Sequence, residues 1–284
     1  MQGTIVKAIS GFYYVLCGGE VVECKARGVF RKQNVTPLVG DHVVVEDSTV
    51  TEILPRKNEF DRPPAANVEV MLLVVTASNP APSFEIIDEL SVDSLKKGCE
   101  TVICINKCDE ADPQLLEKLL ITYKSVFPAI SCSSLSGEGI NELKELISGK
   151  TAALCGPSGS GKSTLANTLL GAEHSVTGSV SEKTGRGKNT TRHTELFSGE
   201  GFLLFDTPGF TSFEAKNIPS EEIEGLFPDL LPFIGKCRFE DCVHLKEPGC
   251  AVTDAVRAGK ISRSRYRSYR KLYKAAKESE DYYG

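Results

Sequence analysis

The stretch Thr-Ala-Ala-Leu-Cys-Gly-Pro-Ser-Gly-Ser-Gly-Lys-Ser at residues 151–163 decides the fold of this chain. Its first part is expected to be a short buried strand, and the next eight residues fit the P-loop pattern. The glycines let successive main-chain N–H groups point at phosphate oxygens, at the start of a helix expected over residues 163–170. The stretch predicts a nucleoside phosphate site made by Gly156, Pro157, Ser158, Gly159, Ser160, Gly161, Lys162, Ser163 and Thr164.

Four polar or flexible positions are expected to carry the phosphate chemistry. Lys162 should reach the β- and γ-phosphate oxygens, and the Ser163 hydroxyl should ligate Mg²⁺. Asp206-Thr-Pro-Gly209 follows an apolar strand expected at residues 202–205. Asp206 is expected to hold Mg²⁺, mostly through water, and Gly209 to bring a main-chain N–H to the γ-phosphate.

A Gly- and Lys/Arg-rich stretch, Thr184–Arg192, lies between these motifs. We expect a loop that orders on the triphosphate and is released after hydrolysis. One threonine should complete the Mg²⁺ shell, Thr191 by preference and Thr190 as the alternative. The competing interpretation is a plain basic surface loop.

Asn106-Lys107-Cys108-Asp109 fits the Asn-Lys-x-Asp pattern by which GTP-binding proteins read guanine. The Asp109 carboxylate can accept hydrogen bonds from guanine N1–H and from the 2-amino group, and adenine lacks both donors. A site built on such polar pairing rejects the analogue that leaves it unpaired. Asn106 is expected to contact the base edge and brace neighbouring loops, and the stem of Lys107 to lie along the ring.

The order of these motifs is unusual. In ordinary GTPases the P-loop comes first, whereas here Asn106 precedes Gly156 by 50 residues. The same loops can meet if the chain enters the fold at another point, since domains tolerate circular permutation. The order predicts a circularly permuted GTPase that takes GTP or GDP with Mg²⁺. Ser133 and Ser134, after the next strand, are expected to offer a main-chain N–H to guanine O6.

The chain divides by pattern into three expected domains, which make a multidomain α/β protein. Residues 1–62 have runs of β-forming residues at Thr4–Leu16, Val21–Phe30 and Asp41–Ile53. They predict an RNA-binding barrel of the OB type, or another small β-barrel. Arg56–Pro64 is expected to be a linker. Alternating strands and helices predict the GTPase domain at residues 63–218. Residues 219–284 are expected to form a zinc-binding helical domain.

Three thiolates and one imidazole fall within 14 residues near the C-terminus. Such short spacing, with a Pro-Gly turn before the last cysteine, suits one closed, structural, tetrahedral Zn²⁺ site. The alternative is scattered free cysteines. The expected ligands are Cys237, Cys242, His244 and Cys250.

Charge is unevenly placed along the chain. The net charge is -5, but residues 255–277 hold nine Lys or Arg and no Asp or Glu, with Tyr266, Tyr269 and Tyr273 interleaved. We expect a basic helix that neutralises RNA phosphates and stacks on bases, or else a solvated surface helix.

Composition indicates the cellular compartment in which the protein is expected. The sequence has no run of about 18 apolar residues and no secretion-signal pattern at Met1, so no membrane span is expected. Ten cysteines in a chain of 284 residues with nucleotide motifs favour free thiols and a cytoplasmic location.

Taken together, Asn106–Asp109, Gly156–Ser163, Gly185–Arg192, Asp206–Gly209 and the Cys237–Cys250 cluster resemble the RsgA family of bacterial ribosome-dependent GTPases, over essentially the whole chain. The resemblance implies an OB-fold N-terminal domain, binding to the small (30S) ribosomal subunit and its 16S rRNA, and a role in late maturation of that subunit. It also implies GTP hydrolysis stimulated by the subunit, and a cytoplasmic monomer.

Two residues depart from common patterns. Members of the family often carry a histidine where this chain has Asn189, and many GTPases have a glutamine at the position of Phe210. Phenylalanine cannot orient the attacking water, so slow hydrolysis is expected without a partner. The alternatives to a GTPase are a P-loop ATPase or kinase, and an RNA-binding scaffold with a structural nucleotide site.

Overall fold

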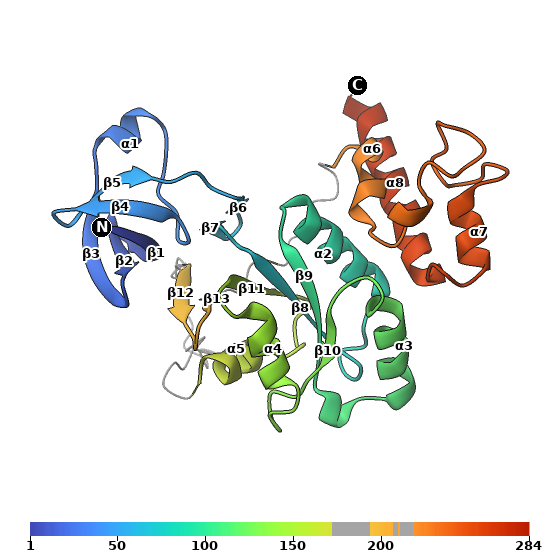
Figure 1. Ribbon diagram of the computed structural model, residues 1–284, viewed down its shortest axis with the longest axis horizontal. Coiled ribbons are helices and arrows are strands. Elements are labelled where there is room, and N and C mark those ends of the chain that lie inside the picture. The colour runs from blue at the N-terminus through green and yellow to red at the C-terminus, as the bar shows by residue number, and fades with distance from the viewer. Residues whose placement is uncertain (172–193, 207–209, 211–217, 284) are drawn as a thin grey trace, which may run out of the picture. The chain divides into compact units, whose positions relative to one another are not determined.

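The protein was analysed as a computed structural model, which describes residues 1–171, 194–206, 210 and 218–283 (Figure 1). The chain forms two compact units, and each combines segments that are far apart in sequence. The first comprises Met1–Leu72, Ser133–Cys155 and Gly161–Phe210. The second comprises Leu73–Cys132, Gly156–Ser160 and Thr211–Gly284. The division into three domains at residues 62 and 218 stays a prediction.

The N-terminal part of the first unit is a five-stranded barrel (blue in Figure 1). Its strands run in the order β1-β2-β3-β5-β4, and β1 also pairs with β4, which closes the barrel. The β3–β5 pairing is parallel and the others are antiparallel. This confirms the expected OB-type barrel, built from β1 (Gln2–Ile9), β2 (Phe12–Cys17), β3 (Glu20–Ala26), β4 (His42–Glu46) and β5 (Thr49–Ile53), with the short helix α1 (Val29–Lys32).

Tight turns set the strand boundaries in the barrel. The run Thr4–Leu16, expected as one β segment, is two strands, because Ser10 and Gly11 have φ of 51° and 85° and reverse the chain. Asp47 and Ser48 do the same between β4 and β5, at 46° and 54°. Such two-residue turns match the twist of a hairpin. Alternation along each strand then points fully buried side chains into the barrel, among them Ile5, Val15, Val43 and Val50.

The segment expected to be a linker is ordered. It forms a small hairpin of β6 (Glu59–Asp61) and β7 (Pro64–Ala66). Arg56, just before it, binds both carboxylate oxygens of the fully buried Asp41, at 2.7 and 2.8 Å. The expectation of a linker was wrong because this two-pronged pair, formed across 15 residues, ties the segment to the barrel.

The rest of the first unit continues the sheet from the barrel. β12 (Glu195–Ser198) pairs antiparallel with β1 and with β13 (Leu203–Asp206), and β13 pairs parallel with β11 (Thr151–Cys155). Lys7 and Glu195 face each other across the β1–β12 pair, with Nζ and Oε1 2.9 Å apart. The helices of this part are α4 (Ile140–Ile147) and α5 (Lys162–Leu170).

The second unit contains β8 (Val70–Thr76, from Leu73 onward), β9 (Glu100–Asn106) and β10 (Ala129–Ser131), in the order β10-β9-β8. Every residue of β8 is buried, as the near-continuous apolar run predicts. Helix α2 (Phe84–Lys96) begins at Ser83, whose Oγ accepts from the Ile86 amide. Helix α3 (Pro113–Tyr123) begins at Asp112, whose carboxylate accepts from two amides of the first turn.

The C-terminal part of the second unit is helical. It consists of α6 (Ser220–Ile223), α7 (Ala251–Arg257) and α8 (Arg263–Tyr283), with short 3-10 turns at Glu224–Leu226 and Leu231–Phe233. Its apolar core includes the fully buried Phe227 and Tyr269, whose rings meet edge to face with centroids 5.5 Å apart. Among the described helices, none is both long enough and apolar enough to cross a membrane.

A buried ion-pair network fastens α8 to α2. The Arg265 guanidinium is fully buried and donates to Asp88 Oδ1 at 2.9 Å and to Asp229 Oδ1 at 2.6 Å. Tyr123 also donates to Asp88 Oδ1, at 2.9 Å. Burial raises the pKa of Asp88, against the opposing pull of Arg265. Burial alone would lower the pKa of Arg265, but the two carboxylates raise it overall. The guanidinium therefore stays charged and holds both acids.

We predict that Arg265→Met destabilises the second unit by about 3–5 kcal/mol, because the buried Asp88 and the half-buried Asp229 lose their cation. The pKa of Asp88 would then rise further. A raised carboxyl pKa means that the folded state holds the proton more tightly, so the defect should shrink from about pH 8 to about pH 5. Urea unfolding followed by circular dichroism measures both effects, since the chain has no Trp.

The matched control is Lys274→Met on the exposed side of the same helix, which should change stability by less than about 0.5 kcal/mol. Equal, pH-independent losses in the two variants would contradict the network.

Candidate functional site

The Asn-Lys-Cys-Asp motif lies where β9 ends, in the second unit. Asn106 is the last residue of the strand and is buried, and Lys107 turns the chain with a φ of 61°. The Cys108 amide then donates to the Cys132 carbonyl at 3.0 Å. Asp109 is exposed in the short turn Cys108–Glu110. The local backbone thus holds the amide of Asn106 inside and presents the Asp109 carboxylate outside.

Asn106 connects this motif to the P-loop. Its Nδ2 donates to the Ser160 main-chain carbonyl at 3.0 Å, although the two residues are 54 positions apart. The Lys107 Nζ donates to the Asn79 carbonyl at 3.1 Å, beside Pro80, which in turn lies 3.4 Å from the position of a Cβ on Gly159. The two motifs therefore share one neighbourhood within the second unit, even though their order in the chain is reversed.

The first half of the P-loop has the shape of a ligand cradle. Gly156 has a φ of +134°, and a Cβ there would lie 2.1 Å from the Val74 carbonyl oxygen, so only glycine fits. The Ser160 hydroxyl is buried and has no hydrogen-bond partner within the described part of the chain. A buried hydroxyl without a partner is costly. The loop residues therefore fit a polar ligand such as a phosphate.

The second half of the P-loop belongs to the first unit. Gly161, with a φ of 87°, precedes α5, and Lys162 is the first residue of that helix. Burial lowers the pKa of Lys162. Ser163 and Thr164 follow in the exposed first turn. A lysine at the start of a helix, beside free main-chain N–H groups, is suited to binding an anion.

Ser133 and Ser134 also lie in the first unit, in a loop braced by its own polar groups. The Ser133 amide donates to the Glu138 carbonyl at 2.9 Å, and its hydroxyl accepts from the amides of Leu135 and Ser136. The Ser134 carbonyl accepts from the Thr168 hydroxyl of α5 at 3.1 Å. The loop is thereby fixed against α5.

The expected residues around the γ-phosphate are only partly described by the structure. Thr190, Thr191 and Gly209 lie outside the described residues, with the whole stretch Gly185–Arg192. Asp206 is the last residue of β13. Phe210 is buried, and its ring packs against Phe60 and Phe205 at centroid distances of 5.2 and 5.8 Å.

The four expected metal ligands come together in the second unit. Their ligand atoms all lie within 4.8 Å of one another. His244 Nδ1 is 3.5, 3.4 and 3.4 Å from the sulfurs of Cys237, Cys242 and Cys250. The sulfurs of Cys237 and Cys250 are 3.9 Å apart. These four donors could hold one tetrahedral metal ion, and together they would fill all four of its coordination positions.

The surroundings orient these ligands. His244 Nε2 lies 3.1 Å from Glu224 Oε2, and a carboxylate in this position fixes the ring and the tautomer of a ligating histidine. Amides of Ala251 and Thr253 donate to the sulfurs of Cys237 and Cys250 at 3.3 and 3.4 Å. Sequence reasoning missed Glu224, because one glutamate among several in Ser220–Glu224 carries no distinguishing signal.

Two of the three interleaved tyrosines, Tyr266 and Tyr269, support the metal cluster, which corrects the expectation of base stacking for the buried Tyr269. Tyr266 and Tyr269 donate to the carbonyls of His244 and Val243, both at 2.8 Å. Tyr269 is fully buried and cannot reach a base. Arg265, counted among the basic residues of the helix, is buried in an ion-pair network. The exposed cations left on α8 are Arg263, Arg267, Lys271, Lys274 and Lys277.

Comparison with known proteins gives consistent matches. Residues 53–216 match the family model described as RsgA GTPase, and residues 2–52 match the RsgA N-terminal domain. A relative from Caldanaerobacter subterraneus subsp. tengcongensis, named small ribosomal subunit biogenesis GTPase RsgA, is 42% identical, covering 99% of this chain and 97% of its own. A relative of the same name from Alkaliphilus metalliredigens is 40% identical, covering 99% of both chains.

Two solved structures share the fold. YloQ, described as a circularly permuted GTPase, superposes with a TM-score of 0.83 at 34% identity, over 98% of this chain and 95% of its own. YjeQ from Thermotoga maritima superposes with a TM-score of 0.82 at 35% identity, over 97% of this chain and 98% of the YjeQ chain.

Proposed function

This chain belongs to the RsgA family, and we propose that it hydrolyses GTP on the small ribosomal subunit through the loops described above, as a step in the biogenesis of that subunit. It is a circularly permuted GTPase. The observation that carries the assignment of the site is the hydrogen bond between Asn106 and the Ser160 carbonyl, because it brings a guanine motif and a phosphate loop together. ATPase or kinase activity, the earlier alternative, finds no support in these relatives.

We assign the guanine base to Asn106, Lys107 and Asp109, and the main-chain hydrogen bond to guanine O6 to Ser133 or Ser134. The exposed Asp109 carboxylate supplies the two acceptors that guanine requires. The triphosphate is assigned to Gly156–Ser163 and Thr164, with Lys162 at the β- and γ-phosphates. The positive-φ glycines and the unpartnered Ser160 hydroxyl support this assignment.

The magnesium ion is assigned to Ser163, Asp206 and one threonine, Thr191 or Thr190, with Gly209 at the γ-phosphate. When bound, Mg²⁺ neutralises charge that develops on the phosphate oxygens. These assignments rest on sequence pattern, since most of the residues lie outside the described part of the chain.

The water-positioning group is the missing element of the site. Phe210 is apolar and packs between two other rings, so it supplies no hydrogen bond to water. We therefore propose that the small subunit completes the hydrolytic site. Contact is expected with 16S rRNA through the OB-type barrel and the exposed cations of α8.

The metal cluster is proposed to hold one structural Zn²⁺. With Zn–S of about 2.3 Å and Zn–N of about 2.0–2.1 Å, tetrahedral ligand atoms lie roughly 3.5–3.8 Å apart. Four of the six ligand-atom separations, at 3.4–3.9 Å, are close to that arrangement, and all six lie within 4.8 Å. The ion would stabilise the loop between Cys237 and Cys250.

We further propose a cytoplasmic monomer. Burial of six cysteines outside the metal cluster, none of them in a disulfide, supports a reducing compartment. These six are Cys17, Cys24, Cys99, Cys104, Cys132 and Cys155.

The proposed activity predicts that purified 30S subunits accelerate GTP hydrolysis by the full chain by about tenfold or more, because they supply the missing water-positioning group. Lys162→Ala should abolish the stimulated rate, whereas Lys124→Ala, an exposed lysine at the end of α3, should keep it. The rate of phosphate release, with and without subunits, is measured for the wild type and for the two variants. Equal rates with and without subunits, in a wild-type chain that binds GTP, would contradict the proposal.

The proposed zinc site predicts that Glu224→Gln lowers Zn²⁺ affinity by about 10–100-fold, since the carboxylate orients His244. Competition with a chelator of known affinity measures this without any assay of hydrolysis. Glu222→Gln, on the neighbouring turn and paired with Lys96, is the control. If both substitutions leave affinity unchanged, Glu224 does not support the ligand.

A further inference from the structure

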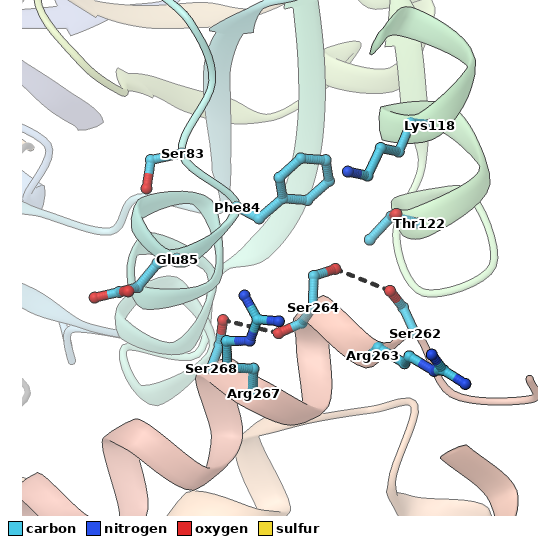
Figure 2. Close-up of a pocket in the computed structure, with 10 residues that line it drawn as sticks. All are labelled: Ser83, Phe84, Glu85, Lys118, Thr122, Ser262, Arg263, Ser264, Arg267 and Ser268. Atoms are coloured by element: carbon cyan, nitrogen blue, oxygen red, sulfur yellow. Dashed lines mark hydrogen bonds between the residues drawn. The ribbon is translucent and has the colours of Figure 1, made fainter. Parts of the chain in front are cut away.

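A pocket of about 460 Å³ lies where α2, α3 and α8 meet in the second unit (Figure 2). It is separate from the nucleotide loops and from the metal cluster, and two of its cations, Arg263 and Arg267, belong to the basic stretch at residues 255–277. Three of its lining residues are cationic and one is acidic. The lining also includes Phe84, Thr122, Ser262 and Ser264.

The charge of the pocket is positive. Lys118, Arg263 and Arg267 line it, and none of them forms an ion pair within the described ranges. The opposing acid, Glu85, is paired with Lys271 of α8. Figure 2 shows the Glu85 carboxylate pointing away from Lys118. An excess of unpaired cations around a hollow attracts an anion.

Main-chain dipoles add to the side-chain charge. Lining residues include the first turns of α2, at Ser83–Glu85, and of α8, at Ser262–Ser264. The Tyr266 amide makes the first bond of α8, to the Ser262 carbonyl at 3.0 Å, so the amides before it are the unsatisfied donors of the helix start. Because α8 has 21 residues, its dipole places partial positive charge at the pocket.

One hydroxyl in the lining of the pocket has no hydrogen-bond partner within the described residues. Thr122 is only 7% exposed, and no hydrogen bond to its hydroxyl is found within the described residues. Figure 2 shows its side chain reaching from α3 toward Ser264. By contrast, the hydroxyls of Ser262 and Ser264 are bonded to each other at 2.9 Å. A hydroxyl without a protein partner in the pocket lining can donate a hydrogen bond to a ligand there.

We propose that this pocket binds a backbone phosphate of RNA, with Arg263 and Arg267 as its cations and Thr122 as a neutral donor. Arginine forks match phosphate oxygens in pairs. The proposal rests on the proposed function, because the RNA is that of the small ribosomal subunit. A further exposed cation, Lys274, lies along α8 beyond the pocket, as a phosphate chain requires and a single free anion does not, whereas Lys277 is paired with Glu280.

An aromatic ring at the pocket fits the same ligand. Phe84 is half-buried, stacks on Tyr123 with a centroid distance of 6.1 Å, and carries the Lys118 ammonium 5.1 Å from its ring centroid. A fixed ring next to a phosphate site can receive a nucleobase or a ribose edge. The pocket therefore combines the groups that recognise one nucleotide of an RNA strand.

The test compares two pairs of charge deletions in the full chain bound to purified 30S subunits, by co-sedimentation at several salt concentrations with a non-hydrolysable GTP analogue. Arg263→Ala/Arg267→Ala should lower affinity by about tenfold or more and reduce the slope of log K against log salt by about 2. Lys124→Ala/Lys260→Ala removes the same charge from exposed positions outside the pocket and outside α8, and should change the affinity and the salt slope far less.

A neutral substitution adds a second readout. Thr122→Val keeps the volume, and should lower affinity about three- to tenfold with the salt slope unchanged, because it removes a hydrogen bond and no charge. An unaltered affinity in this variant, or equal losses in the two charge pairs, overturns the pocket as the contact. A wild-type chain that binds and is stimulated by subunits would still uphold the proposed function in that case.

The free-anion reading is tested with inorganic phosphate alone. If phosphate raises the melting temperature of the wild type at submillimolar concentration, and not that of the Arg263→Ala/Arg267→Ala variant, the pocket serves a free anion and the RNA assignment is wrong. No stabilisation at that concentration, together with the loss of subunit affinity, supports the RNA assignment.

Discussion

The hydrogen bond from Asn106 to the Ser160 carbonyl is the contact on which the nucleotide site depends. It is buried and joins residues 54 positions apart. Alone it contributes only about 0.5–1.5 kcal/mol, but losing it would leave polar groups unpaired in the interior. Gly156 completes the constraint, since its backbone lies too close to the Val74 carbonyl for any side chain. Reversed motif order is tolerated because strand ends, and not chain order, bring these loops together.

The C-terminal helix carries a second set of constraints. Arg265 binds α2 through Asp88, while Tyr266 and Tyr269 hold the loop that bears the metal ligands. One face of α8 is therefore committed to the interior, and the opposite face is left to its exposed cations. Since the guanine motif and α8 belong to the same compact unit, the metal cluster is part of the body that holds Asn106.

The sequence was most informative where function is encoded in short, fixed spacings. The P-loop, the Asn106–Asp109 motif and the Cys/His cluster are each confined to a short stretch of the chain, of roughly a dozen residues or fewer. It was least informative about long-range pairs. Arg265 and Asp88 are 177 residues apart, so the arginine was counted as a surface cation. The hairpin at residues 59–66 was taken for a linker because its anchor, the Arg56–Asp41 pair, leaves no periodic pattern. Glu224 carries no signal apart from its position beside His244.

The central claim is that the loops at Asn106 and Gly156 form one guanine nucleotide site, and calorimetric titration of Asp109→Asn tests it most directly. The wild type should prefer GDP to ADP by about 10²-fold or more, because adenine leaves the carboxylate unpaired. The variant should lose its affinity for GDP and gain affinity for xanthosine diphosphate, because the 2-oxo group of xanthine accepts a hydrogen bond from the new amide. Equal affinity of the wild type for GDP and ADP, or a variant that keeps GDP binding unchanged, would contradict the account.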